Sequence, residues 1–92
     1  MTAGVARIAN RAGIHVRPSG IIFSEMKDYP GKIRISAKGS SADLKNVIGL
    51  IALGLQPDDT VEVSVTGPDD EDVCGSLVEL LEREYDFPPR NA

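Results

Sequence analysis

Valine stands at every second position within residues 60–66, and this alternation is the strongest restriction on the fold. Val61, Val63 and Val65 are separated by polar residues. Because successive side chains of a strand point to opposite faces, the pattern predicts a strand with one buried face and one face in water. A sheet that contains such a strand must cover its apolar face with another layer.

Three other segments predict strands. Apolar and polar residues alternate in the same way at residues 33–37. Residues 38–40, Lys-Gly-Ser, suit a turn that would lead into a weaker strand at residues 41–44. Residues 4–9 predict a short first strand, although their alternation is less regular.

The segment after residue 15 has the period of a helix. Pro18 suits the first turn of a helix, because its missing N–H would have no partner there. Ile22, Met26 and Tyr29 follow at spacings of four and three residues, which puts them on one helix face. Gly20 weakens this helix, so we expect tertiary packing to support it.

Two more helices are predicted. Residues 47–53 form a short one, with Asn46 as its N-cap and Gly54 just past its end. The last helix is capped by Asp69 or Asp70, and its first turn is acidic, the favoured sign at that end of the helix dipole. Its apolar face has four residues at helical spacing: Val73, Leu77, Leu80 and Leu81.

The predicted order of elements is therefore βαββαβα. Half-buried strands mixed with amphipathic helices indicate a two-layer α+β domain, with a mainly antiparallel sheet covered on one face. A chain of 92 residues suits a single domain over residues 1–92. Two prolines in the tail lead us to expect loose order at residues 87–92.

Composition excludes several classes of function. Acidic residues outnumber basic ones by 14 to 10, whereas nucleic-acid binding depends on basic surfaces. One histidine and one cysteine cannot supply an ordinary metal cage, and no glycine-rich loop points to a nucleotide cofactor. Cys74 fits a small core residue in a reducing compartment. No segment has the length of a signal peptide or a membrane span, so we expect a cytoplasmic protein without membrane insertion.

His15 is the strongest candidate for chemistry. It stands at the predicted start of a helix, where the backbone N–H groups of Val16 and Arg17 lack partners and the dipole favours an anion. The Arg17 side chain can add charged donors to a phosphate, and Pro18 positions the local backbone. A positive environment lowers the pKa of an imidazole, which leaves a ring nitrogen free to attack at neutral pH. The alternative is an incidental surface histidine beside a solvated arginine.

The segment at residues 47–55 is too apolar for a short helix with one buried side. At about 100° per residue, Leu50 and Leu53 share one face, and we assign them to the core. The neighbouring face would be an exposed docking surface for partners, framed by Lys45 and Arg17, and it consists of Val47, Ile48 and Ile51. The alternative is that all of these side chains belong to the core.

Residues 13–19, Gly-Ile-His-Val-Arg-Pro-Ser, and residues 44–54, Leu-Lys-Asn-Val-Ile-Gly-Leu-Ile-Ala-Leu-Gly, form two motifs at a characteristic distance. The first resembles the active-site motif of the HPr family, the histidine-containing phosphocarriers of the bacterial phosphoenolpyruvate-dependent sugar phosphotransferase system. The second resembles that family's second-helix segment. The resemblance covers residues 5–85 and implies an open-faced α+β sandwich, with a four-stranded sheet and three helices on one face.

The resemblance also implies a function. Enzyme I would phosphorylate His15 on Nδ1, and the group would pass to an enzyme IIA protein or domain and on to an incoming sugar. Arg17 matches the family arginine that assists the transfer. The protein would be a monomeric covalent carrier without a cofactor, not an enzyme that turns over a substrate alone. It would meet its partners through the helix beside the histidine.

Asn46 departs from the family pattern. Many HPr proteins have a serine there that a dedicated kinase phosphorylates, and an asparagine has no hydroxyl group to accept phosphate. We therefore expect no phosphorylation at position 46, while the side-chain oxygen of Asn46 keeps its capping role.

Two other interpretations are open at this level. A regulatory paralogue, with a nitrogen-regulatory or transcriptional partner, would keep His15 and change only its partners. A small-molecule-sensing α+β domain with an incidental histidine would bind a metabolite and ignore enzyme I.

Overall fold

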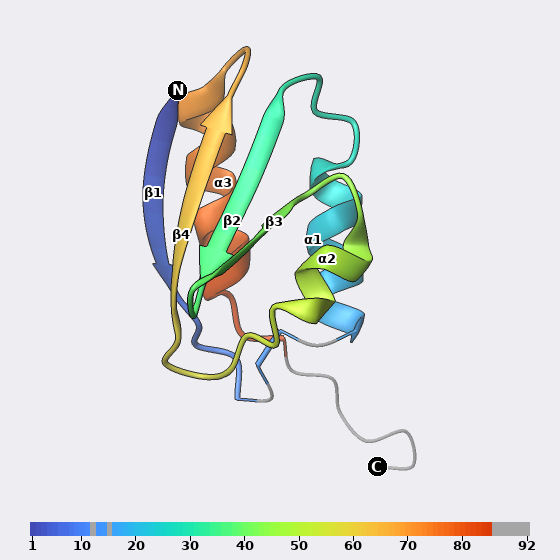
Figure 1. Cartoon of the computed structure of the whole chain (residues 1–92), viewed down its shortest axis with the longest axis vertical. Coiled ribbons are helices and arrows are strands. Elements are labelled where there is room, and N and C mark those ends of the chain that lie inside the picture. The colour runs from blue at the N-terminus through green and yellow to red at the C-terminus, as the bar shows by residue number, and fades with distance from the viewer. Residues whose placement is uncertain (12, 15, 86–92) are drawn as a thin grey trace.

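The computed structural model describes residues 1–11, 13–14 and 16–85 of the chain. It contains a four-stranded sheet in the order β1-β4-β2-β3, in which every neighbouring pair is antiparallel (Figure 1). The strands are β1 (Thr2–Arg7), β2 (Lys32–Ala37), β3 (Ser40–Asp43) and β4 (Thr60–Thr66). The helices are α1 (Val16–Met26), α2 (Val47–Ala52) and α3 (Asp70–Glu82). The predicted α+β order, βαββαβα, is confirmed.

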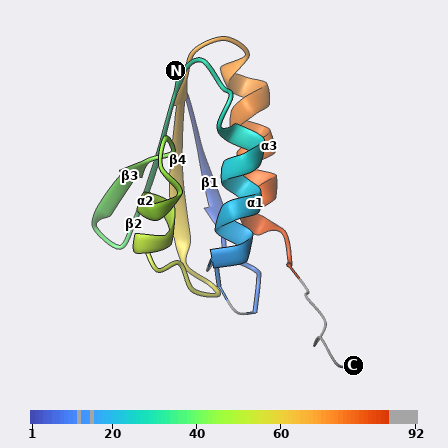
Figure 2. The same ribbon diagram turned by 90° about the vertical axis from the view of Figure 1, so that its right-hand side faces the viewer.

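The helices cover one face of the sheet. Figure 2 shows α1 and α3 side by side along that face, and α3 packs against β1 and β4. The short helix α2 packs against α1 and β3. This arrangement is the predicted open-faced sandwich, and it leaves the other face of the sheet uncovered.

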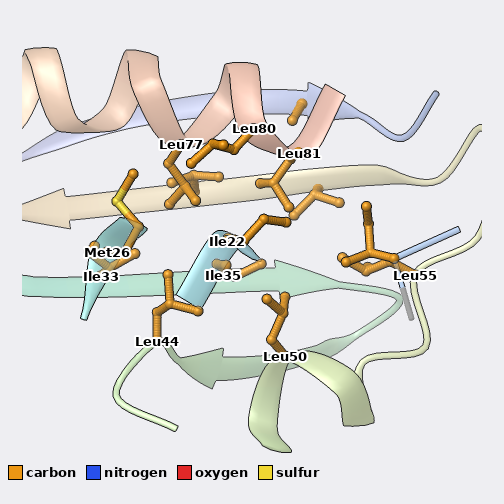
Figure 3. Packing of buried hydrophobic residues seen from close by; sticks show 14 of the residues in the cluster. Ile22, Met26, Ile33, Ile35, Leu44, Leu50, Leu55, Leu77, Leu80 and Leu81 are labelled. Carbon is orange, nitrogen blue, oxygen red and sulfur yellow. The ribbon is translucent and has the colours of Figure 1, made fainter. Parts of the chain in front are cut away.

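Strand β4 behaves as its alternation predicts. Val61, Val63 and Val65 are buried, while Glu62 and Thr66 are exposed. The strand lies between β1 and β2, so both of its backbone edges are hydrogen-bonded. Its valines contribute to one continuous core with side chains from all three helices, including Ile22, Leu50 and Leu81 (Figure 3).

Strand β1 differs from its predicted bounds. It spans Thr2–Arg7 and not residues 4–9, because Thr2 and Ala3 pair with Val65 and Ser64 of β4. The small, weakly apolar residues at this end carry little strand signal, and the partner strand decides where pairing begins. Strand β3 is shifted by one residue at both ends, to Ser40–Asp43, and α2 ends one residue early, at Ala52. The placement of Tyr29 on the face of the first helix is wrong, because α1 ends at Met26.

Asn46 caps α2 as predicted, because its Oδ1 accepts a hydrogen bond of 2.8 Å from the backbone N–H of Ile48. The prediction for α3 is only half right. Asp69 occupies the N-cap position, but its side chain makes no capping hydrogen bond and its φ is +51°. Asp70 is the first residue of α3, and its carboxylate accepts a hydrogen bond from the N-terminal ammonium group of Met1 at 3.1 Å. That hydrogen bond is the main reason that the pKa of Asp70 is lowered.

The packing of α3 on β1 depends on a glycine. A Cβ added at Gly4 would lie 3.0 Å from Cys74 Sγ and 3.2 Å from a methyl carbon of Val78. Cys74 is buried with a free thiol, as predicted for a small core residue. Burial raises the pKa of this thiol, and the nearby carboxylate of Asp70 raises it further.

We expect Gly20→Ala to stabilise the protein. Gly20 is an exposed residue of α1, and an added Cβ would meet no atom within 4 Å. Removing the backbone freedom of a glycine in a helix should raise the free energy of unfolding by about 0.5–1 kcal/mol. Urea denaturation measures the change. Gly4→Ala is the matched control and should lower stability, because its Cβ meets the core.

Candidate functional site

The candidate site surrounds the start of α1. His15 lies outside the described residues, and α1 begins at the next residue, Val16. Val16, Arg17 and Pro18 therefore form the first turn of a helix, as predicted from the proline. The first N–H groups of any α-helix have no partner within the helix and sit at the positive end of its dipole. Arg17 is exposed on this turn, whereas Pro18 is buried.

The chain just before position 15 is held against the segment that follows α2. The backbone N–H of Ile14 donates a hydrogen bond of 2.9 Å to the carbonyl oxygen of Leu55. Gly13 lies beside the same carbonyl with φ +73°, and an added Cβ would clash with that oxygen. Only glycine adopts the left-handed conformation at low cost, and only glycine lacks the Cβ that would prevent this close approach. The side chain of Ile14 is buried in the core.

A buried asparagine ties the same segment to the chain that follows α3. Asn10 is 3% exposed, and its Nδ2 donates a hydrogen bond of 2.6 Å to the carbonyl oxygen of Gly13. Its Oδ1 accepts a bond of 2.6 Å from the backbone N–H of Tyr85. The side chain therefore uses both of its polar groups, as a buried amide must. Position 15 thus follows a segment that is fixed from two sides.

The segment after α2 is itself organised by an ion pair. Lys38 Nζ lies 2.8 Å from Asp59 Oδ2 and donates a bond of 2.7 Å to the carbonyl oxygen of Gly54. The hydrogen bond from Lys38, followed by one from the backbone N–H of Gln56, lowers the pKa of Asp59. A lowered carboxyl pKa stabilises the fold above the unfolded value of about 3.9 and loses this effect as pH falls through the folded value.

The side chains of α2 and Leu53 are divided between core and surface as predicted. Ile48 is 67% exposed, and Val47 and Ile51 are half-buried. Leu50 and Leu53 are buried in the core, as assigned from their helix face. We give the name α2 patch to the exposed and half-buried residues of the predicted docking surface: Lys45, Val47, Ile48 and Ile51. Because α2 packs against α1, the patch belongs to the helix next to the candidate site.

Other kinds of site find no support in the part of the chain that the structure describes. Within residues 1–11, 13–14 and 16–85, no three His, Cys, Asp or Glu side chains are grouped so that they could hold a metal ion. No helix in those ranges is long and apolar enough to cross a membrane.

Sequence reasoning missed three residues that organise the surroundings of the site: Asn10, Lys38 and Tyr85. Their partners lie 3, 16 and 75 residues away along the chain, respectively. A local signal existed only for Asn10, which stands in the polar turn before Gly13.

We expect Gly13→Ala to destabilise the protein strongly. The left-handed backbone alone costs a residue with a Cβ about 1–2 kcal/mol, and the contact with the Leu55 carbonyl adds to this cost. Gly39→Ala is the matched control, because Gly39 has φ +79° but no atom within 4 Å of an added Cβ. Urea denaturation of both variants isolates the contact. Equal losses of stability would contradict a close approach at Gly13.

Comparison with known proteins connects this geometry to a family. The family model described as "PTS HPr component phosphorylation site" matches residues 4–83. The phosphocarrier protein HPr of Mycoplasma genitalium is 29% identical over 79 residues, which cover 85% of this chain and 90% of that protein. HPr of Mycoplasma pneumoniae is 27% identical over 77 residues, which cover 83% of this chain and 88% of that protein.

Solved structures agree in fold. HPr-C-His from Thermoanaerobacter tengcongensis superposes with a TM-score of 0.80 at 25% identity, covering 88% of this chain and 91% of that chain. HPr from Bacillus anthracis superposes with a TM-score of 0.82 at 17% identity, covering 88% and 96%, and this likeness supports the fold alone. Since the family model spans nearly all of the described residues and includes the start of α1, the chain belongs to the HPr family of phosphocarrier proteins of the phosphotransferase system.

Proposed function

We propose that this protein accepts a phosphoryl group from enzyme I on His15 and passes it to an enzyme IIA protein or domain in sugar uptake. The observation that carries the proposal is the start of α1 at Val16, directly after the single histidine of the chain. The protein would act as a monomeric carrier in the cytoplasm and would complete a turnover only with its two partners.

The chemistry follows from the first turn of α1. A neutral imidazole nitrogen of His15, Nδ1 in this proposal, attacks the phosphorus, a nitrogen–phosphorus bond forms, and the bond from phosphorus to enzyme I breaks. The N–H groups of Val16 and Arg17, at the positive end of the helix, stabilise the negative charge of the transferred group. The Arg17 guanidinium adds charged donors, and Pro18 holds the turn in shape. The second transfer reverses these steps toward the acceptor.

The α2 patch would bring the partners to this turn. Ile48 is among the most exposed large apolar side chains of the described residues, and an exposed apolar patch beside a reactive group marks an interaction site. Lys45, within the patch, and Arg17 are both exposed. They would orient an acidic partner surface, although the whole chain carries a formal net charge of −4.

Asn46 bears on regulation. Its side-chain oxygen is engaged with the N–H of Ile48, and it has no hydroxyl group. We propose that control by a serine kinase at this position is absent.

We expect His15→Ala to abolish labelling by enzyme I and radioactive phosphoenolpyruvate. The wild-type protein should carry an acid-labile, base-stable label, the behaviour of a phosphorus–nitrogen bond. Circular dichroism of the variant, with an unchanged unfolding transition, controls for loss of fold. Labelling that persists in the variant would sink the assignment of His15.

The acceptor distinguishes the branches of the family. Transfer from the labelled protein to an enzyme IIA supports sugar uptake. Transfer only to a nitrogen-regulatory or transcriptional partner would assign the protein to a regulatory branch.

We expect Ile48→Glu to weaken binding to enzyme I at least tenfold, because it places a carboxylate in the apolar contact and opposite an acidic partner. Stability should change little, since the side chain is 67% exposed. The matched control is Val5→Glu, at a residue that is 61% exposed on β1, away from the α2 patch. Titration calorimetry and thermal unfolding on both variants test the prediction. Equal binding by the two variants would place docking elsewhere.

A further inference from the structure

Lys38 adopts a backbone conformation that is unusual for a lysine. It forms, with Gly39, the two-residue turn between β2 and β3, where Ala37 pairs with Ser40. Its φ is +54° and that of Gly39 is +79°, the pattern of a type I′ turn. Asparagine is favoured at the first position of this turn, because its side chain tolerates the left-handed region. The turn would therefore form more easily with asparagine than with lysine at position 38.

The ammonium group of Lys38 bridges both ends of the segment that follows α2. It donates a hydrogen bond of 2.7 Å to the carbonyl oxygen of Gly54, at the end of the helix, and lies 2.8 Å from Asp59 Oδ2. The same carboxylate oxygen accepts a bond of 2.7 Å from the backbone N–H of Gln56. We call residues 54–59 the bridged loop. Its ends are held together by one cation whose side chain is 44% exposed.

The bridged loop supports the chain that leads to position 15. The carbonyl oxygen of Leu55 accepts the N–H of Ile14 at 2.9 Å, and Gly13 packs on the same carbonyl. At the other end of the loop, the N–H of Ile8 donates to the carbonyl oxygen of Asp59 at 2.9 Å. Figure 1 shows the β2–β3 turn, the chain after α2 and the chain before α1 gathered at the same end of the sheet.

We infer that Lys38 is a positioning residue for phosphoryl transfer: by bridging Gly54 and Asp59 it sets the place of the Leu55 carbonyl and, through the bond to that carbonyl, the place of Ile14, which precedes His15 in the chain. The inference rests on the proposed function of His15. It explains why a lysine occupies a left-handed position: the bridge offsets an unfavourable turn. The bonds of Lys38 run to Gly54 and Asp59, so the effect on transfer that we infer is indirect.

Lys38→Asn separates positioning from stability. Asparagine suits the turn, so the unfolding midpoint should stay equal or rise, while the bridge is lost. The rate constant for transfer from phosphorylated enzyme I should fall roughly tenfold with KM unchanged, since misplacement by about 1 Å can cost up to ~10²-fold. Lys38→Arg keeps the cation and should retain most of the rate. Lys32→Asn removes an exposed charge from the other end of β2 and should leave the rate unchanged.

Amide hydrogen exchange provides a readout that does not need enzyme I. Exchange at the Ile14 N–H should accelerate in Lys38→Asn and keep its wild-type rate in Lys32→Asn. An unchanged transfer rate, an effect on KM alone, or a fall in rate without faster exchange at Ile14 would overturn the inference. If the wild-type protein takes no label on His15, the proposed function fails, and the exchange experiment still decides whether Lys38 holds Ile14.

Discussion

The burial of the valines of β4 is the interaction on which the rest of the fold depends. Val61, Val63 and Val65 are each at most 1% exposed, in the strand that pairs with both β1 and β2. Burying side chains of this size is worth about 1.5–3 kcal/mol each. Because all three point to the same face, α1 and α3 must lie on that face. The other face of the sheet remains in water, which explains the polar residues between the valines.

This one-sided arrangement also decides where a site can form. Neighbouring strands of an antiparallel sheet run in opposite directions, so the chain turns at the ends of the sheet. The connections to the helices therefore gather at those ends. The chain before α1, the turn between β2 and β3, and the segment after α2 meet at one such end (Figure 1). They are joined by bonds from Ile14 to Leu55 and from Lys38 to Gly54. A helix start is thus presented on a support that is built from distant parts of the chain.

The first turn of α1 and the α2 patch are held in place in different ways. The first turn of α1 is fixed through backbone contacts and the buried residues Ile14 and Pro18. The α2 patch belongs to a helix of six residues that depends on the Asn46 cap and on the burial of Leu50. A helix this short has little stability of its own. The positions of Val47, Ile48 and Ile51 therefore depend on the packing of α2 on the core.

Local patterns in the chain were sufficient for the element types and for the face that each element buries. The two-residue period of β4, the spacing of Ile22 and Met26, and the Asn46 cap each depend on neighbours within one element, and the structure agrees with all three. The start of α1 near Arg17 and Pro18 could also be predicted, because the residues that favour a helix start are neighbours in the sequence. The start of the first strand could not be predicted in this way, since Thr2 pairs with Val65 from far along the chain. The same holds for the pairing of Asp70 with the N-terminal ammonium group. The contacts that support the site could not be predicted either. Lys38 meets Asp59, and Asn10 meets Tyr85, only in the folded chain. No repeating pattern in the sequence indicates pairs of residues that lie so far apart along the chain.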